Sequence, residues 1–165
     1  MRVVLLSDTH VKPKTAALPE WVREELRRAD RAIHAGDFDS RSALETIESL
    51  AADLTAAAGN MDRRLDFPAV ATADLGGVRF VVTHGAGPDE GYERRVAETV
   101  AEHAVGGPTV GVSGHTHGVV DTTVDGYRLL NPGSATGAWP ARAETLMIAE
   151  VDAGGLVVSV RRKEA

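Results

Sequence analysis

The chain has 165 residues, of which 43% are hydrophobic and 25% charged, and this predicts one soluble globular domain spanning residues 1–165. A formal net charge of -6 argues against a general nucleic-acid-binding surface, because such a surface needs clustered basic residues. The absence of cysteine excludes disulfides, thiolate nucleophiles and Cys-ligated metals. The apolar N-terminal run, residues 1–6, is too short for a signal peptide or a membrane span, so we expect a cytoplasmic protein with no membrane partner.

The first third of the chain alternates strands and helices. Apolar, β-branched runs predict strands, and apolar residues at helical spacing between charges predict helices. Ser40 is the expected N-cap of the second helix, which runs through Leu50. Pro13 and Pro19 bracket a loop. The expected elements are a strand at 2–6, a helix at 20–30, a strand at 31–35, a helix from 40 to 50 and a strand at 53–58.

Hairpins dominate the remainder of the chain. Glycine-containing turns at 76–77, 125–126 and 154–155 each separate two apolar runs. The expected strand pairs are 69–75 with 78–83, 119–124 with 127–130, and 146–151 with 156–161, with a helix at 92–104 and a strand at 109–112. The pattern predicts an α/β protein whose mixed, strand-rich core is covered by helices.

Polar side chains follow the C-terminal ends of the predicted strands, where α/β folds gather ligand and cofactor groups. They include four of the six histidines, and they are Asp8, His10, Asp37, Asn60, His84, His115 and His117. Imidazole, carboxylate and amide groups together suit borderline divalent metals, and poorly suit calcium or an all-oxygen magnesium cage. Seven ligands are too many for one tetrahedral zinc but enough for two metals that share one carboxylate. Each short motif is weak alone, and the ordered set carries the inference.

The set resembles the signature of the calcineurin-like metallophosphoesterase superfamily. Its blocks appear here in order as SDTH (7–10), GD (36–37), GNMD (59–62), HG (84–85) and GHTH (114–117). The segment NPGS (131–134) resembles the minimal bacterial and archaeal phosphodiesterase branch. The resemblance implies a four-layer α/β/β/α sandwich, in which helices flank two mixed β-sheets.

The resemblance also implies roles for individual residues. Asp8, His10 and His117 would bind a first metal, and Asn60, His84 and His115 a second, with Asp37 as the bridging carboxylate. The implied cofactors are two divalent ions, with Mn²⁺ expected and Ni²⁺, Co²⁺, Fe²⁺ or Zn²⁺ as alternatives. A metal-bridging hydroxide would attack a small phosphodiester in line. Asp37, Asn60 and His115 would serve this step, and Asn60 and Arg63 would contact substrate.

Met61 departs from the family pattern, which usually places a histidine acting as general acid at this position. A methionine cannot donate a proton, and a general acid is worth about 10²–10⁴-fold in rate. We therefore expect slow turnover or a preference for good leaving groups. The same fold also serves as a scaffold subunit of the eukaryotic retromer, so a non-catalytic metal-binding or protein-interaction scaffold is the alternative. Retention of all seven ligands favours the enzyme.

Several other conspicuous residues have simpler interpretations. His34 is expected to be a core histidine, and His103 a surface residue at a helix C-terminus. Arg63 and Arg64 are as compatible with solvated surface charge as with phosphate binding. Trp21 and Trp139 are expected to be core or interface anchors. The resemblance further implies self-association as a homodimer or higher homo-oligomer.

Overall fold

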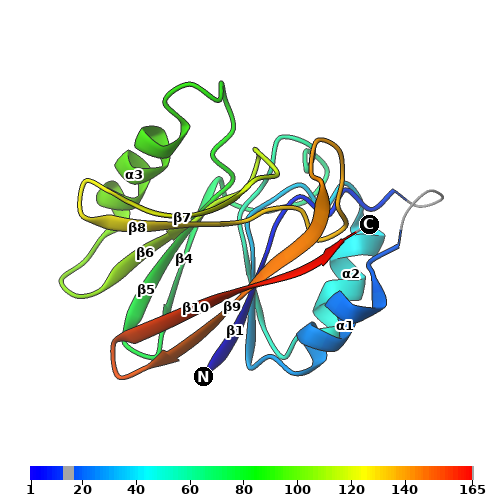
Figure 1. Cartoon of the computed structure of the whole chain (residues 1–165), viewed down its shortest axis with the longest axis horizontal. Helices are drawn as coiled ribbons and strands as arrows, with labels where there is room; N and C mark the ends of the chain where they lie inside the picture. The colour runs from blue at the N-terminus through cyan, green and yellow to red at the C-terminus, as the bar shows by residue number, and fades with distance from the viewer. Residues whose placement is uncertain (13–16, 165) are drawn as a thin grey trace.

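Two five-stranded sheets form the centre of the computed structural model, which describes residues 1–12 and 17–164 (Figure 1). Pro13, the first residue of the expected loop, lies outside these residues. The described elements, in chain order, are β1 (Arg2–Leu6), α1 (Glu20–Arg27), β2 (Arg31–His34), α2 (Arg41–Leu50), β3 (Leu54–Ala56), β4 (Val70–Leu75), β5 (Val78–Thr83), α3 (Tyr92–His103), β6 (Thr109–Val112), β7 (Val119–Val124), β8 (Tyr127–Pro132), β9 (Ala143–Asp152) and β10 (Gly155–Glu164).

Both sheets are mixed. The first has the order β10-β9-β1-β2-β3, in which β1, β2 and β3 are parallel and β9 and β10 are antiparallel to their neighbours. The second has the order β4-β5-β6-β8-β7, in which β5, β6 and β8 are parallel and the two outer strands are antiparallel. The C-terminal ends of parallel strands lie at one edge of each sheet, so the loops that follow them gather there.

The sheets pack face to face between two helical layers. Val4 and Leu6 of β1 belong to the core beneath α1 and α2, whereas Val3 and Leu5 belong to the core between the sheets. Burial on both faces explains why β1 is apolar from Val3 to Leu6. A third cluster joins α3 to the outer face of the second sheet through residues such as Val100. Figure 1 shows α1 and α2 on one side of the molecule and α3 on the other, which confirms the expected four-layer α/β/β/α sandwich.

The expected elements are confirmed in order and type, with differences at their ends. The Ser40 hydroxyl accepts a hydrogen bond from the Ala43 N–H at 3.1 Å, so it caps α2 as predicted. The first helix ends at Arg27 instead of residue 30, because the chain tightens into i→i+3 hydrogen bonds there. The last hairpin is longer than expected, with ten residues in each strand, because polar residues at its far end continue the ladder. No helix within the described residues is long and apolar enough to cross a membrane.

Candidate metal centre

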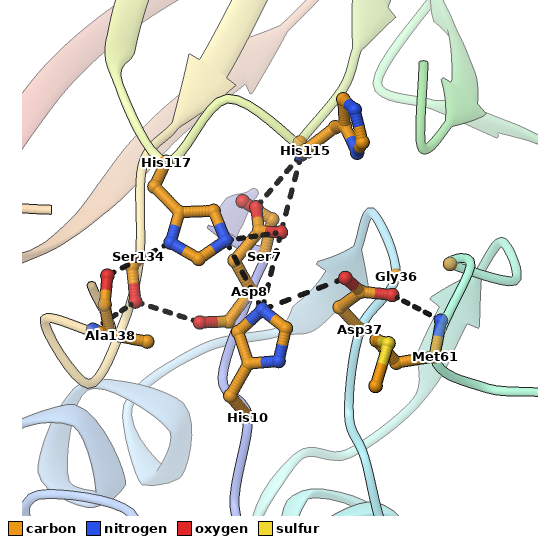
Figure 2. Close-up of polar contacts among 12 residues, drawn as sticks. Ser7, Asp8, His10, Gly36, Asp37, Met61, His115, His117, Ser134 and Ala138 are labelled. Carbon is orange, nitrogen blue, oxygen red and sulfur yellow. Dashed lines mark hydrogen bonds and ion pairs between the residues drawn. The ribbon is translucent and has the colours of Figure 1, made fainter. Parts of the chain in front are cut away.

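Loops at the C-terminal ends of five strands carry the seven residues expected to bind metal. The loop after β1 carries Asp8 and His10, and the loops after β2 and β3 carry Asp37 and Asn60. From the second sheet come His84, directly after β5, and the pair His115 and His117 after β6. The sandwich thus brings residues more than 100 positions apart into one cluster (Figure 2).

Asp8, His10 and His117 form the first group of close donor atoms. The Nδ1 atom of His117 lies 2.8 Å from the Ala138 carbonyl oxygen, and Nδ1 of His10 lies 3.2 Å from Asp39 Oδ2. Because a carbonyl or carboxylate oxygen only accepts, each Nδ1 must carry the hydrogen. The lone pairs of the two Nε2 atoms therefore face each other across 3.1 Å, and Asp8 Oδ1 lies 3.3 Å from Nε2 of His117.

Asp37, Asn60 and His84 repeat this arrangement. The Nδ1 atom of His84 donates to the Ala35 carbonyl oxygen at 2.7 Å, which leaves its Nε2 as an acceptor. That nitrogen faces Asn60 Oδ1 at 2.9 Å and Asp37 Oδ2 at 3.4 Å. Asp37 Oδ2 is also 3.5 Å from Nε2 of His10, so this oxygen lies between the donors of both groups. It occupies the place that a bridging carboxylate would need.

The facing acceptors of the cluster repel each other unless a proton or a metal ion lies between them. Burial lowers the pKa of His84, but contact with Asp37 and the charge of Asp8 outweigh burial and raise it. Burial also lowers the pKa of His117, but contacts with Asp8 and with the Ala138 carbonyl outweigh burial and raise it. Burial raises the pKa of Asp37, but contact with His84 outweighs burial and lowers it. Buried carboxylates facing imidazole lone pairs fit divalent ions, which would replace the bound protons.

His115 contacts Asp8 of the cluster through its backbone N–H, whereas its ring forms a hydrogen bond outside the cluster. Its N–H donates to both oxygens of Asp8, at 3.0 and 3.2 Å. Its ring Nε2 donates to the Gly87 carbonyl oxygen at 2.9 Å, and the ring centre lies 5.2 Å from that of His84. Figure 2 shows the ring turned away from the His10 and His117 pair. Only Nδ1 is left to bind a cation, and the role of His115 as a ligand stays a prediction.

Asp62 fixes the loop that carries Asp37. Its buried carboxylate accepts hydrogen bonds from four backbone N–H groups, at 2.7 to 3.2 Å, and these belong to Asp37, Phe38, Asp39 and Gly59. The Met61 N–H in turn donates to Asp37 Oδ1 at 2.9 Å. The GNMD block therefore positions the bridging carboxylate by its main chain and by Asp62, whatever side chain stands at residue 61.

The backbone at the site is unusual as well. Eight non-glycine residues among the described ones have positive φ, and six of them are ligand candidates or their neighbour, namely Asp8, His10, Asp37, Asp39, His115 and His117. Such conformations cost free energy and persist at functional sites where the surrounding structure imposes them. Gly59 allows two loops to meet, because a Cβ there would lie 2.0 Å from Asp37 Oδ1.

Three residues outside the seven ligand candidates support the site, and the sequence did not predict these contacts. Asp39 orients His10, and the only sequence signal is a second aspartate two positions after Asp37. Asn131 donates to the Gly114 carbonyl oxygen at 2.9 Å, and the Ser134 hydroxyl donates to the Asp8 carbonyl oxygen at 2.7 Å. The NPGS segment therefore braces the loops that hold the ligand candidates.

The remaining histidines and the two tryptophans lie outside the group of ligand candidates. His34 is fully buried, stacks on Phe38 and accepts the Gly36 N–H at 3.1 Å, and burial lowers its pKa to about 3. It is a core histidine, as predicted. His103 is half-buried at the end of α3, where its ring contacts the Thr99 carbonyl oxygen at 2.9 Å. Trp21 packs against the core, whereas Trp139 is 90% exposed.

A cavity of about 460 Å³ opens over the cluster. Five of the seven ligand candidates line it, together with Lys12, Met61 and Trp139; the five are His10, Asp37, Asn60, His115 and His117. Arg63 does not line this cavity and instead belongs to a neighbouring one. A small molecule can therefore reach the cluster from solvent, and Lys12 is a cationic side chain in the lining of this cavity.

Known proteins share this architecture. A family model described as "Calcineurin-like phosphoesterase superfamily domain" matches residues 1–154. A protein named probable metallophosphoesterase from Methanothermobacter thermautotrophicus is 31% identical over 138 residues, which cover 82% of this chain and 78% of that protein. Wild-type Vps29 complexed with zinc, from Entamoeba histolytica, has a TM-score of 0.79 at 23% identity and covers 99% of both chains. A novel archaeal phosphodiesterase has a TM-score of 0.71 at 22% identity, covering 98% of this chain and all of that one. At these identities the two structures show the shared fold.

Proposed function

Because the chain belongs to the calcineurin-like phosphoesterase superfamily, we propose that it is a metal-dependent phosphodiesterase with a binuclear centre and that its substrate is a small phosphodiester. The observation that carries this proposal is the pair of contacts in which lone pairs face each other, His10 with His117 and His84 with Asn60. Asp37 Oδ2 lies between them. This supports two ions that share one carboxylate, with Mn²⁺ expected and Ni²⁺, Co²⁺, Fe²⁺ or Zn²⁺ as alternatives.

When bound, the ions would lower the pKa of a coordinated water and neutralise charge on the phosphoryl oxygens. The chain's own residues would then orient the substrate. Asn60 and Lys12 line the cavity and would contact oxygens of the phosphodiester. Hydrogen bonds from Met61 and the anchor at Asp62 would hold Asp37 still during the reaction. Such fixed positioning accounts for much of the rate in phosphate chemistry.

We expect the rate of hydrolysis to depend on how easily the alcohol group leaves the phosphodiester. Met61 is 51% exposed at the cavity rim and has no proton to donate to a departing oxygen. Turnover should therefore rise steeply as the pKa of the leaving alcohol falls, with aryl esters hydrolysed faster than alkyl esters. This dependence separates the proposed reaction from one that includes a side-chain general acid.

The test is hydrolysis of bis-p-nitrophenyl phosphate by protein stripped with a chelator, with and without added Mn²⁺. We expect Mn²⁺-dependent turnover that Asp37→Ala abolishes and His84→Gln lowers at least a hundredfold. His103→Gln is the matched control, because this histidine lies on α3 away from the cluster, and it should retain the wild-type rate. Absence of turnover from folded protein with Mn²⁺, Ni²⁺, Co²⁺, Fe²⁺ and Zn²⁺ would contradict the proposal.

The alternative is a non-catalytic scaffold of the same fold. Two observations favour it, namely Met61 in place of an acid and the exposed Trp139 beside the cavity. A scaffold would still bind metal, but it would hydrolyse no aryl diester. The same assay therefore separates the two functions when metal binding is measured on the same sample. Self-association stays a prediction under either function.

A further inference from the structure

A second cavity, of about 580 Å³, adjoins the metal cavity. The two share Asp39 and Met61, so the Met61 side chain stands at the boundary between them. The lining comes from the start of α2 and from the loop after β3, and it consists of Asp39, Ser40, Arg41, Met61, Asp62, Arg63, Arg64 and Leu65. We call this cavity the arginine pocket.

The arginine pocket concentrates positive charge on an acidic chain. Arg41, Arg63 and Arg64 are exposed, and none of them forms an ion pair with the described residues. Many other arginines are paired, among them Arg79 with Asp74 and Arg128 with Asp121. Three free guanidinium groups around one cavity repel each other, and a bound anion would relieve this repulsion.

The two acidic residues that line the pocket expose little of their side chains to an incoming ligand. Asp62 is 2% exposed and its oxygens accept four backbone N–H groups. The Asp39 side chain is 4% exposed and one of its oxygens faces His10. An incoming ligand would therefore meet guanidinium groups, together with the apolar side chains of Met61 and Leu65.

We propose that the arginine pocket binds a second anionic group of the substrate, so that the natural substrate is a phosphodiester that carries a further phosphate. Guanidinium groups bind phosphate through paired N–H donors, and a terminal phosphate offers three oxygens and up to two negative charges to the three arginines. The apolar boundary at Met61 would contact the organic group that links the two phosphates. This inference rests on the proposed function, because the reacting phosphodiester is placed in the metal cavity.

The experiment compares two substrates that differ only in the second anion. They are thymidine 5′-(p-nitrophenyl phosphate) and the same compound with a 3′-phosphate. With Mn²⁺ present, we expect kcat/KM to be at least about tenfold higher for the 3′-phosphate compound, the effect of 1.4 kcal/mol. In Arg41→Gln/Arg63→Gln/Arg64→Gln this preference should fall to less than twofold. Arg94→Gln, an exposed arginine of α3 paired with Glu98, is the matched control and should keep it.

Binding distinguishes failure of this inference from failure of the proposed function. Calorimetric titration of the Mn²⁺-loaded protein with thymidine 3′,5′-bisphosphate and with thymidine 5′-monophosphate measures the same preference without turnover. Tighter binding of the bisphosphate, lost in the triple variant, would support the pocket even if neither ester is hydrolysed. Equal affinities in the wild type, equal kcat/KM values where both esters are measurably hydrolysed, or equal losses for both compounds in the triple variant would overturn the inference.

Discussion

Gly59→Ala tests the position of the proposed bridging carboxylate without changing any ligand. The backbone of Gly59 does not lie in the left-handed region, so alanine avoids the strain of that conformation. The added Cβ would lie 2.0 Å from Asp37 Oδ1 and 2.3 Å from the Asp37 backbone nitrogen. Ordinary contacts begin near 3.4 Å, so these atoms must separate by about 1.4 Å. The clash therefore falls on Asp37 itself.

Two magnitudes follow from this displacement. Overpacking of this kind costs about 1–3 kcal/mol of unfolding free energy, which corresponds to a fall in Tm of about 2–12 °C for a chain of this size. Misplacing a group by about 1 Å costs on the order of 10²-fold in rate. We therefore expect Gly59→Ala to fold, to melt a few degrees lower, and to lose about 10²-fold in Mn²⁺-dependent hydrolysis of bis-p-nitrophenyl phosphate.

Gly106→Ala is the matched control for this prediction. It adds the same methyl group at an exposed glycine with no atom within 4 Å of the new Cβ. It should leave both the rate and Tm unchanged. A rate for Gly59→Ala within twofold of the rate for Gly106→Ala, with both proteins folded, would show that Asp37 can be displaced without loss of function and that its fixed position is not required.

Three further predictions concern the groups that support the site. Asp39→Ala removes the acceptor that orients His10, and calorimetry should show Mn²⁺ affinity lowered about 10–100-fold; unchanged affinity would remove Asp39 from the account. Asp62→Ala leaves four backbone N–H groups without their acceptor, and urea unfolding should show a loss on the order of 4 kcal/mol; a loss below 1 kcal/mol would contradict its anchoring role. The pKa of His34 falls from 6.5 to about 3 in the folded state, so its contribution to stability is full above pH 6.5 and is lost as pH falls toward 3. Between pH 7.5 and 5.5 the wild type should lose ~1.4 kcal/mol more than His34→Gln, and parallel pH profiles would show that His34 takes up a proton in the folded protein.

The layers of the fold follow from local patterns in the sequence. Residues 3–6 are apolar throughout, which is the composition expected of a short strand buried on both faces. Glycine-containing turns set the hairpins, and Ser40 set the start of α2. The ends of β9 and β10 could not be predicted, because residues such as Thr145 and Arg162 are polar and pair through the backbone, which any side chain permits.

The candidate site could be predicted in part for a related reason. The seven ligand candidates follow strands, and parallel strands bring their C-terminal ends together, so a cluster was expected. The contacts that orient these residues depend on pairs far apart in the chain, such as His117 with Ala138 and Ser134 with Asp8. The arginine pocket is of the same kind, since it forms where Arg41 on α2 meets the loop after β3. Contacts between residues so far apart in the chain cannot be predicted from a local sequence pattern.

Anomalous scattering at the manganese edge would show whether two ions share Asp37. Crystals grown from chelator-stripped protein and soaked in Mn²⁺ should show two anomalous peaks per chain. One peak should lie among Asp8, His10 and His117, the other beside Asn60 and His84, and Asp37 should contact both. A single peak, no peak, or two peaks of which only one contacts Asp37 would rule out a binuclear centre bridged by Asp37.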